Sequence, residues 1–148
     1  MAITSSVNTI FKRDVMLEGH DLESDTLRIA LVSSSASASG GGPNTYASVT
    51  GEISGTADAS GDSKYTTGGT TLTDVTVTAV SSSGVVDFAD VTWTSATWTA
   101  RGCVIYNETN SDKVVAVYDF GGDKTVTNGT FQLVIPSATS AAAVIRLN

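Results

Sequence analysis

The chain has 148 residues, 41% of them hydrophobic, and a formal net charge of −7 at pH 7. This is the length of one ordinary domain, and a chain of this size buries about two thirds of its unfolded surface, so it forms a core without covalent staples. The acidic balance argues against nucleic-acid binding, which needs basic side chains against phosphate, and against an electrostatic role at an anionic membrane surface.

The cysteine content and the first residues bear on the compartment. Cys103 is the only cysteine, so no intrachain disulfide can form. It lies in the apolar run Cys103-Val104-Ile105-Tyr106, which favours a buried, inert thiol over a nucleophile. The chain starts without the apolar segment, about 7–15 residues long, of a secretory signal, and its apolar stretches are far shorter than the roughly 20 residues of a membrane span. We expect a protein that works in solution or inside an assembly.

The N-terminal part predicts a short arm followed by a helix. The first seven residues are small and polar-leaning, and they predict an arm or an edge segment that takes part in contacts: Met1, Ala2, Ile3, Thr4, Ser5, Ser6 and Val7. Asn8 is a suitable cap for a helix that runs to about Leu17, with Gly19 as its stop.

Residues 26–33 alternate, with Leu27, Ile29 and Leu31 on one side, and this predicts a strand with one face in the core. Residues 33–43 are low in complexity and predict a loop that buries nothing. The whole segment 33–69 predicts one long excursion, and loops of that length are often functional. Pro43 and Tyr46 within it are candidate contact residues.

After Gly69 the pattern becomes regular. Short strands are predicted over 71–80, 85–89, 91–94, 96–107, 113–120, 131–135 and 142–147, with Gly-, Ser- and Asn-rich turns between them. Together with the strand at 26–33 they predict an all-β fold: an antiparallel β-sandwich or jelly-roll-like barrel of about eight strands, with one short N-terminal helix. Residues 1–148 are predicted to form a single domain.

The candidate catalytic groups are better explained as structural residues. Asp87 and Asp90 near an aromatic side chain are compatible with a glycosidase pair, but they suit an outward strand position and a turn. Asp119-Phe120-Gly121 copies a kinase metal motif without the other kinase motifs. The loop acids around Asp58 and Asp112 lack the fixed spacing of a calcium loop. His20 is predicted to be a polar residue beyond the helix end rather than a general base.

The aromatic residues leave two readings open. Trp93, Trp98, Tyr106 and Tyr118 would form a sugar-binding platform if they faced outward. Their place within alternating strands favours core anchors or contacts between subunits. We therefore expect a protein that is not an enzyme and has no catalytic residues, cofactor or metal.

Several segments carry a resemblance to a known family. They are Phe11-Lys-Arg-Asp-Val-Met-Leu-Glu-Gly-His-Asp, Ser24-Asp-Thr-Leu-Arg-Ile-Ala-Leu-Val-Ser-Ser, Tyr65-Thr-Thr-Gly-Gly-Thr-Thr-Leu-Thr-Asp-Val-Thr-Val, Val86-Asp-Phe-Ala-Asp-Val-Thr-Trp93, Thr99-Ala-Arg-Gly-Cys-Val-Ile-Tyr-Asn107, Lys113-Val-Val-Ala-Val-Tyr-Asp-Phe-Gly-Gly-Asp-Lys124 and Ala143-Val-Ile-Arg-Leu. The chain resembles a family of small virion structural proteins of tailed bacteriophages over most of residues 8–147. Residues 34–63 depart from the pattern by being longer and richer in Ser, Gly and Ala.

The resemblance implies a particle component with no catalytic residues to transfer. We expect a head decoration, or cement, protein that binds the outer capsid surface, stabilises the shell and is assembled in the host cytoplasm. Its partners would be the major capsid protein and itself, as a homotrimer, because capsid lattices offer threefold positions. Neither nucleic acid nor membrane is expected as a partner. The alternative is a tail, fibre or baseplate component, including one that binds host glycans. A small glycan hydrolase is a remote third class.

Overall fold

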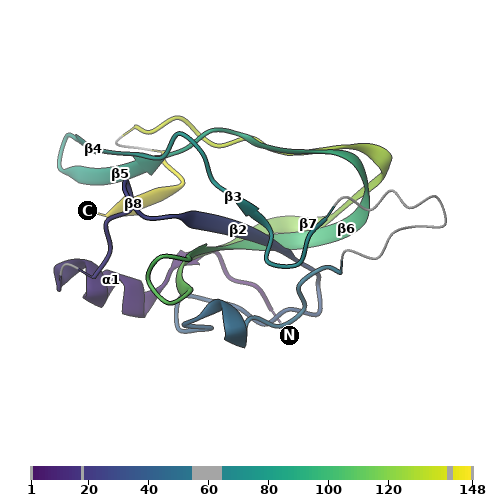
Figure 1. The fold of residues 1–148 in the computed structure, drawn as a ribbon, viewed down its shortest axis with the longest axis horizontal. Helices are drawn as coiled ribbons and strands as arrows, with labels where there is room; N and C mark the ends of the chain where they lie inside the picture. Colours follow the sequence, from purple (N-terminus) through teal and green to yellow (C-terminus); the bar gives the residue numbers. More distant parts are fainter. Residues whose placement is uncertain (1, 18, 55–64, 140–141, 148) are drawn as a thin grey trace.

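In a computed structural model of the chain, which describes residues 2–17, 19–54, 65–139 and 142–147, eight strands form two antiparallel sheets and one short α-helix lies near the N-terminus (Figure 1). The larger sheet has the strand order β1-β7-β6-β2-β3, and the smaller one has the order β4-β5-β8. The prediction of an all-β sandwich with about eight strands and a short N-terminal helix is confirmed.

The elements of the larger sheet are β1 (Ser6–Val7), β7 (Lys113–Leu133), β6 (Val91–Asn107), β2 (Leu27–Val32) and β3 (Thr70–Thr71). Those of the smaller sheet are β4 (Thr76–Val80), β5 (Ser83–Asp87) and β8 (Ile145–Leu147). The helices are α1 (Thr9–Met16) and a 3-10 turn, η1 (Tyr46–Ser48). Within the described residues, none of the helices is both long and apolar enough to cross a membrane.

Helix α1 begins where the sequence predicts it. The Asn8 side-chain oxygen accepts hydrogen bonds from the N–H groups of Ile10 (2.8 Å) and Phe11 (3.2 Å), two donors that the first helical turn leaves without a partner. Phe11 is buried, whereas Met16 at the end of the helix is 78% exposed. The helix is therefore anchored through its first turns and presents its C-terminal end to solvent.

The β6–β7 hairpin is the longest unit and spans the molecule (Figure 1). The sequence predicts breaks within these strands, at residue 95 and at residues 121–123 and 127–129, and that prediction is wrong. Each of these places is instead an irregularity in a continuous pairing, with Ser95, Gly121 and Asn128 at positive φ. Turn-forming residues inside a paired strand produce bulges, which bend the strand without ending it. The hairpin can therefore curve from one layer of the sandwich to the other.

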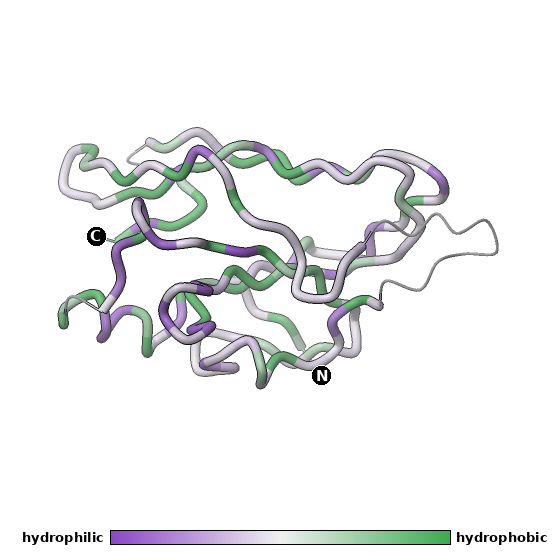
Figure 2. The backbone as a smooth tube through the Cα atoms, in the orientation of Figure 1, coloured by the Kyte–Doolittle hydropathy of each residue, from purple (hydrophilic) through white to green (hydrophobic). Residues whose placement is uncertain are grey.

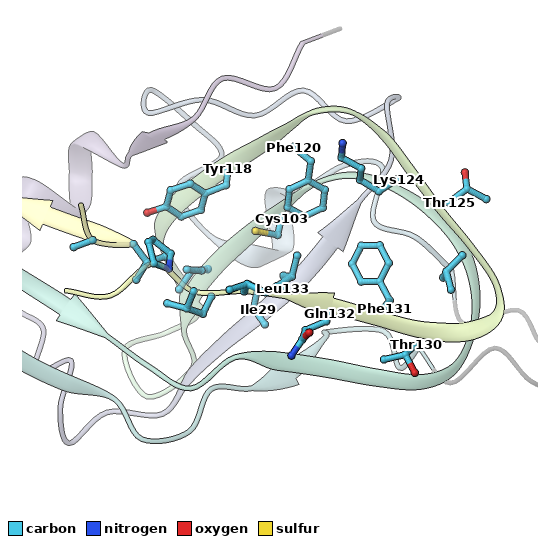
Figure 3. A pocket seen from close by; sticks show the side chains of 17 residues that line it. Ile29, Cys103, Tyr118, Phe120, Lys124, Thr125, Thr130, Phe131, Gln132 and Leu133 are labelled. Carbon is cyan, nitrogen blue, oxygen red and sulfur yellow. The ribbon is translucent and has the colours of Figure 1, made fainter. Parts of the chain in front are cut away.

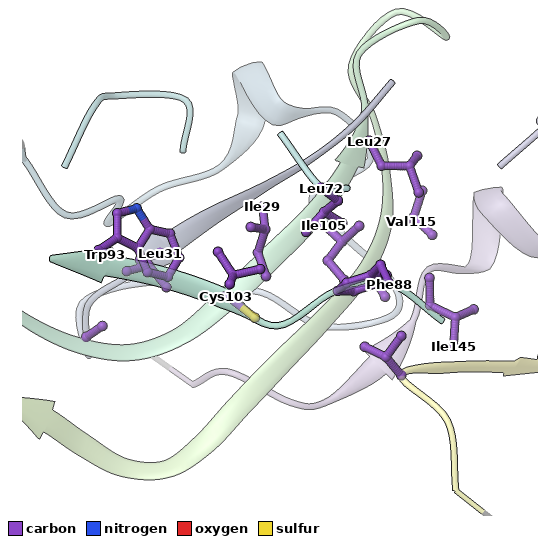
Figure 4. Packing of buried hydrophobic residues seen from close by; sticks show 14 of the residues in the cluster. Leu27, Ile29, Leu31, Leu72, Phe88, Trp93, Cys103, Ile105, Val115 and Ile145 are labelled. Atoms are coloured by element: carbon purple, nitrogen blue, oxygen red, sulfur yellow. The ribbon is translucent and has the colours of Figure 1, made fainter. Parts of the chain in front are cut away.

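The main core lies between the two layers (Figure 4). As predicted, Leu27, Ile29 and Leu31 of β2 face it. They pack with residues of the β6–β7 hairpin and of the opposite layer, including Leu72, Phe88, Trp93, Cys103, Ile105, Val115 and Ile145. Apolar and polar stretches alternate along the strands that enclose this core (Figure 2). Each buried aliphatic or aromatic side chain contributes roughly 1.5–3 kcal/mol of transfer free energy.

A second apolar cluster covers the outer face of the larger sheet, which corrects two predictions. Ala30 and Val32 of β2 are buried as well, so both faces of this strand are covered. The cover includes Ile3, Ala36 and Ala38, each at most 9% exposed. The low-complexity loop therefore does bury apolar surface, because its Ala36 and Ala38 belong to the same buried cluster as Ala30 and Val32 of β2.

The predicted strand 71–80 is divided between the two sheets. Thr70–Thr71 pair with β2, and the Leu72 N–H donates to the Leu27 carbonyl. Asp74 then takes φ 55°, and the chain leaves for β4. The threonine- and valine-rich run is thus bent at Asp74, whose backbone lies in the left-handed region. The alternation pattern does not reveal this bend.

Candidate interaction surfaces

The predicted N-terminal contact residues lie against the larger sheet. Ser6 and Val7 pair with Val117 and Ala116 of β7, and the Ser5 hydroxyl accepts a hydrogen bond from the Asp119 N–H (2.8 Å). Ile3 bridges Ala38 and is buried, the Thr4 N–H donates to the Ala38 carbonyl (2.9 Å), and Ala2 is exposed. Met1 lies outside the described residues. The sequence predicted either a free arm or an edge segment here, and residues 3–7 form an edge segment.

Pro43 and Tyr46, the other predicted contact residues, also have partners within the chain. Pro43 is buried, and its carbonyl accepts a hydrogen bond from the Asn8 side chain (3.0 Å). Tyr46 stacks on Tyr106, with ring centroids 4.5 Å apart and an interplanar angle of 17°. Most of the predicted contact residues therefore already make contacts within the chain.

A carboxylate joins three segments beside this stack. Glu52 accepts hydrogen bonds from the hydroxyls of Tyr65 (2.6 Å) and Tyr46 (2.5 Å) and from the Gly68 N–H (2.7 Å). Burial, followed by the hydrogen bond to Glu52, raises the pKa of both phenols, so they remain donors at neutral pH. Tyr106 donates to the Gly68 carbonyl (2.6 Å). The cluster therefore joins Tyr46 and Glu52 to the last residues of the 33–69 excursion, Tyr65 and Gly68. Residues 55–64, between these two parts, lie outside the described residues.

The most exposed large apolar side chains of the described residues lie elsewhere. Met16 and Leu17, at the end of α1, are 78% and 70% exposed, and Val134, beyond the end of β7, is 71% exposed. Val77 of β4 is 43% exposed, and it lines a groove of about 390 Å³ between α1 and the smaller sheet, together with Val15. Exposed large apolar residues that are adjacent are typical of contact surfaces. We call Met16 and Leu17 the α1 end patch. These two residues differ from other apolar residues only in the exposure of their side chains in the folded chain, so the sequence could not identify the patch.

A buried polar network lies behind this end of the molecule. Asp14 is only 3% exposed, and its carboxylate accepts hydrogen bonds from Arg13 (2.8 Å) and Lys113 (2.7 Å). The hydrogen bond from Lys113, followed by that from Arg13, lowers the pKa of Asp14. The network ties α1 to the start of β7.

His20 belongs to the same region. The Asn107 side-chain amide donates to Asp25 (2.6 Å) and faces His20 Nδ1 at 3.0 Å, so the ring nitrogen acts as an acceptor and the imidazole is neutral. The ring packs edge-on against Phe11, with centroids 4.9 Å apart. Burial and then the positive charge of Lys113 lower the pKa of His20, against smaller opposing effects of Asp14 and Asp25.

We expect the folded state to lose stability when His20 is protonated. Because its pKa is lower in the folded chain than the ordinary value of 6.5, the unfolded chain binds the proton first, and stability falls as the pH drops below about 6.5. The loss is about 1 kcal/mol or less, since the ring is only partly buried and solvent screens its charge. Urea denaturation at pH 7.5 and 5.0 measures it.

His20→Gln is the matched control for this prediction, since it keeps an acceptor for Asn107 but does not titrate. The variant is expected to flatten the pH dependence between pH 7.5 and 5.0, whereas Asp14 acts only at lower pH because its own pKa is lowered. As the only histidine in the chain, His20 can also be titrated directly by NMR. A folded-state pKa at or above 6.5 would contradict the prediction.

The acidic residues considered as catalytic groups occupy structural positions. One Asp87 oxygen accepts a hydrogen bond from the neighbouring Phe88 N–H (3.0 Å), and Asp90 accepts one from the Ile135 N–H (2.8 Å). Asp119 is paired with Arg101 (2.9 Å) and accepts the Gly121 N–H, which places the kinase-like triplet in a bulge. Among the described residues, no group of three or more His, Cys, Asp or Glu side chains is arranged to hold a metal ion. Asp58 lies outside the described residues.

The aromatic residues confirm the prediction of core anchors. Trp93 and Trp98 are each 8% exposed, Tyr106 is 3% exposed, and Tyr118 is partly buried. The two tryptophan rings meet edge to face, with centroids 5.9 Å apart, and both lie near Phe131. Such contacts stabilise the curved half of the hairpin by about 0.5–1.5 kcal/mol each beyond their burial.

Cys103 is expected to be inert in the folded chain. Its thiol is 3% exposed, and burial raises its pKa to about 12. Since the thiolate is the reactive form, an aromatic disulfide reagent at pH 8 should label the native protein about a thousandfold more slowly than the urea-unfolded protein. The double variant Cys103→Ala, Val134→Cys places the thiol at a 71% exposed position and is expected to react at once. Equal rates for native and unfolded wild-type protein would refute the prediction.

The sequence reasoning also missed an apolar groove of about 650 Å³ between the two halves of β7 (Figure 3). Alternation identified its residues as core residues, and no local signal shows that the layers leave space between them.

Comparison of the chain with protein-family models, with curated proteins and with solved structures finds no match.

Proposed function

We propose that the protein is a structural component of a tailed-bacteriophage virion: a capsid decoration, or cement, protein that binds the outer head surface and stabilises the shell. The observation that carries the proposal is the resemblance of the segments between residues 8 and 147 to small virion structural proteins. The fold agrees with this role, because a two-layer sandwich closed by its own N-terminal segment is a rigid contact module.

The α1 end patch is the surface through which we propose contact with the shell. Met16 and Leu17 offer adjacent apolar side chains, while Asn8 and Phe11 fix the helix that carries them. A contact of this kind is weak for one copy, but it becomes strong when several copies bind together. We therefore propose the major capsid protein as partner and a homotrimer as the assembled form, located on the outer capsid surface after assembly in the host cytoplasm.

Binding of the purified protein to undecorated heads, followed by co-sedimentation, tests the proposed surface. Met16→Glu places a charge in the contact and is expected to weaken binding at least tenfold, since a desolvated charge costs more than about 1.4 kcal/mol. Val134→Glu is the matched control: it adds the same charge at a position 71% exposed, and it should bind as the wild type does.

The outcomes of this experiment separate the candidate functions. Equal binding by the Met16→Glu and wild-type proteins would remove the α1 end patch from the proposal. Binding to tails but not to heads would favour the alternative, a tail, fibre or baseplate component.

A further inference from the structure

The groove between the halves of β7 has the dimensions of a ligand site (Figure 3). It measures about 650 Å³, and pockets for small organic ligands commonly measure about 300–1,000 Å³. Ile29 and Cys103 belong to its floor, Tyr118 and Phe120 come from the first half of β7, and the segment after Phe131 supplies the opposite wall.

The groove is lined mainly by apolar side chains. Most of the lining residues are aliphatic or aromatic, among them Ile105, Tyr118, Phe120, Leu133, Ile135 and Ala143. Several of them remain partly exposed although they pack against the core, among them Phe120, Leu133 and Ile135. An apolar body that entered the groove would remove this surface from water.

One cation stands at the edge of this apolar surface. Lys124 is the only charged residue in the lining, and no ion pair or hydrogen bond joins its ammonium group to another side chain in the described part of the chain. By contrast, Arg101 on the neighbouring strand is paired with Asp119 (2.9 Å) and Asp123 (3.9 Å). Lys124 is therefore available to an anion, while the nearby carboxylates are already paired.

We propose that this groove binds an amphiphile that has an aliphatic or aromatic body and one acidic head group. The body lies along the apolar walls, and the head group pairs with Lys124 at the rim. This inference does not depend on the particle role, since it concerns another surface than the α1 end patch.

Binding of dodecanoate to the full chain, below its micelle concentration, tests the proposal. Isothermal titration should show one saturable site, with an affinity that rises up to about fourfold for each methylene added between octanoate and dodecanoate. In the same assay dodecylamine should bind at least threefold more weakly than dodecanoate, because Lys124 repels its head group. In methyl NMR spectra, dodecanoate should shift Leu133 and Ile135 and leave Val77, in the other groove, unchanged.

Two variants locate the site. Ala143→Trp fills the groove from its partly exposed wall and is expected to weaken dodecanoate binding at least tenfold. Lys124→Glu should reverse the preference between dodecanoate and dodecylamine, whereas Lys12→Glu on α1, with the same change of charge, should preserve it. Thermal unfolding of each variant confirms that it folds.

Three results would overturn the proposal. They are the absence of saturable binding to the wild-type protein, an unchanged affinity in the Ala143→Trp variant, and an equal affinity for the carboxylate and the amine. If Ala143→Trp fails to fold, the reversal of preference in Lys124→Glu decides the question alone. None of these results changes the capsid-binding prediction for Met16.

Discussion

Gly69→Ala is expected to destabilise the protein by more than about 3 kcal/mol, the largest effect expected from one added methyl group. A Cβ at this position would lie 1.8 Å from the Ile29 carbonyl oxygen and 2.5 Å from its carbon. Both atoms belong to the backbone of β2, where β3 pairs with it, so the chain can relieve the overlap only by separating the two strands. Urea denaturation followed by tryptophan fluorescence measures the loss.

Gly121→Ala is the matched control, because it places alanine at a similar positive φ without a steric overlap between the added Cβ and another part of the chain. Gly69 has φ +74° and Gly121 has φ +75°, so alanine suffers nearly the same backbone strain at both positions. At Gly121, however, an added Cβ meets no atom within 4 Å. The control is expected to lose only about 1–2 kcal/mol. Equal losses in the two variants would show that β3 does not approach β2 as closely as described.

Glu52→Ala is expected to destabilise the protein by about 2–4 kcal/mol, since three donors lose their acceptor at once. The hydroxyls of Tyr46 and Tyr65 and the Gly68 N–H all point at the Glu52 carboxylate. A buried donor without an acceptor costs the free energy of its desolvation, and hydrogen bonds to a carboxylate are stronger than neutral ones. Equilibrium denaturation in urea at pH 7 measures the effect.

Tyr46→Phe serves as the control for this cluster, because it removes one donor and keeps the ring that stacks on Tyr106. It is expected to cost about 1 kcal/mol, the net value of a single hydrogen bond. A loss from Glu52→Ala no larger than that from Tyr46→Phe would mean that the carboxylate does not join the three segments.

Local patterns in the sequence were enough to predict the elements whose residues decide their own structure. The β2 strand followed from the alternation of Leu27, Ile29 and Leu31, and helix α1 from a cap at Asn8. In both cases the signal and the structure that it specifies lie within one short segment. The same holds for the burial of Cys103 and the tryptophans, since apolar residues inside strands face a core in either layer.

Features that depend on contacts between distant segments could not be predicted in this way. Nothing near Ala36 shows that it will be buried, because the cluster that it joins includes Val104 and Val117 from strands far along the chain. Gly121 and Asn128 carry turn chemistry, and only their pairing partners on β6 make them bulges rather than turns. For the same reason, the sequence could not show that the halves of β7 leave a groove between them.

The candidate contact residues illustrate this limit. Ile3 and Pro43 belong to segments for which the sequence predicts no regular structure, yet both are buried in the folded chain. Met16 lies within the predicted helix and is not among the predicted contact residues, yet it is 78% exposed. Exposure of a single side chain is a property of the folded molecule, so a contact surface is recognised only after the domain is built.

Cryo-electron microscopy of undecorated phage heads and tails, mixed with the purified protein, tests the proposed role most directly. The proposal predicts ordered density at repeated positions of the head lattice, with three copies around each position and the end of α1 against the shell. Density on tails alone, or heads that stay bare at saturating protein, would contradict it.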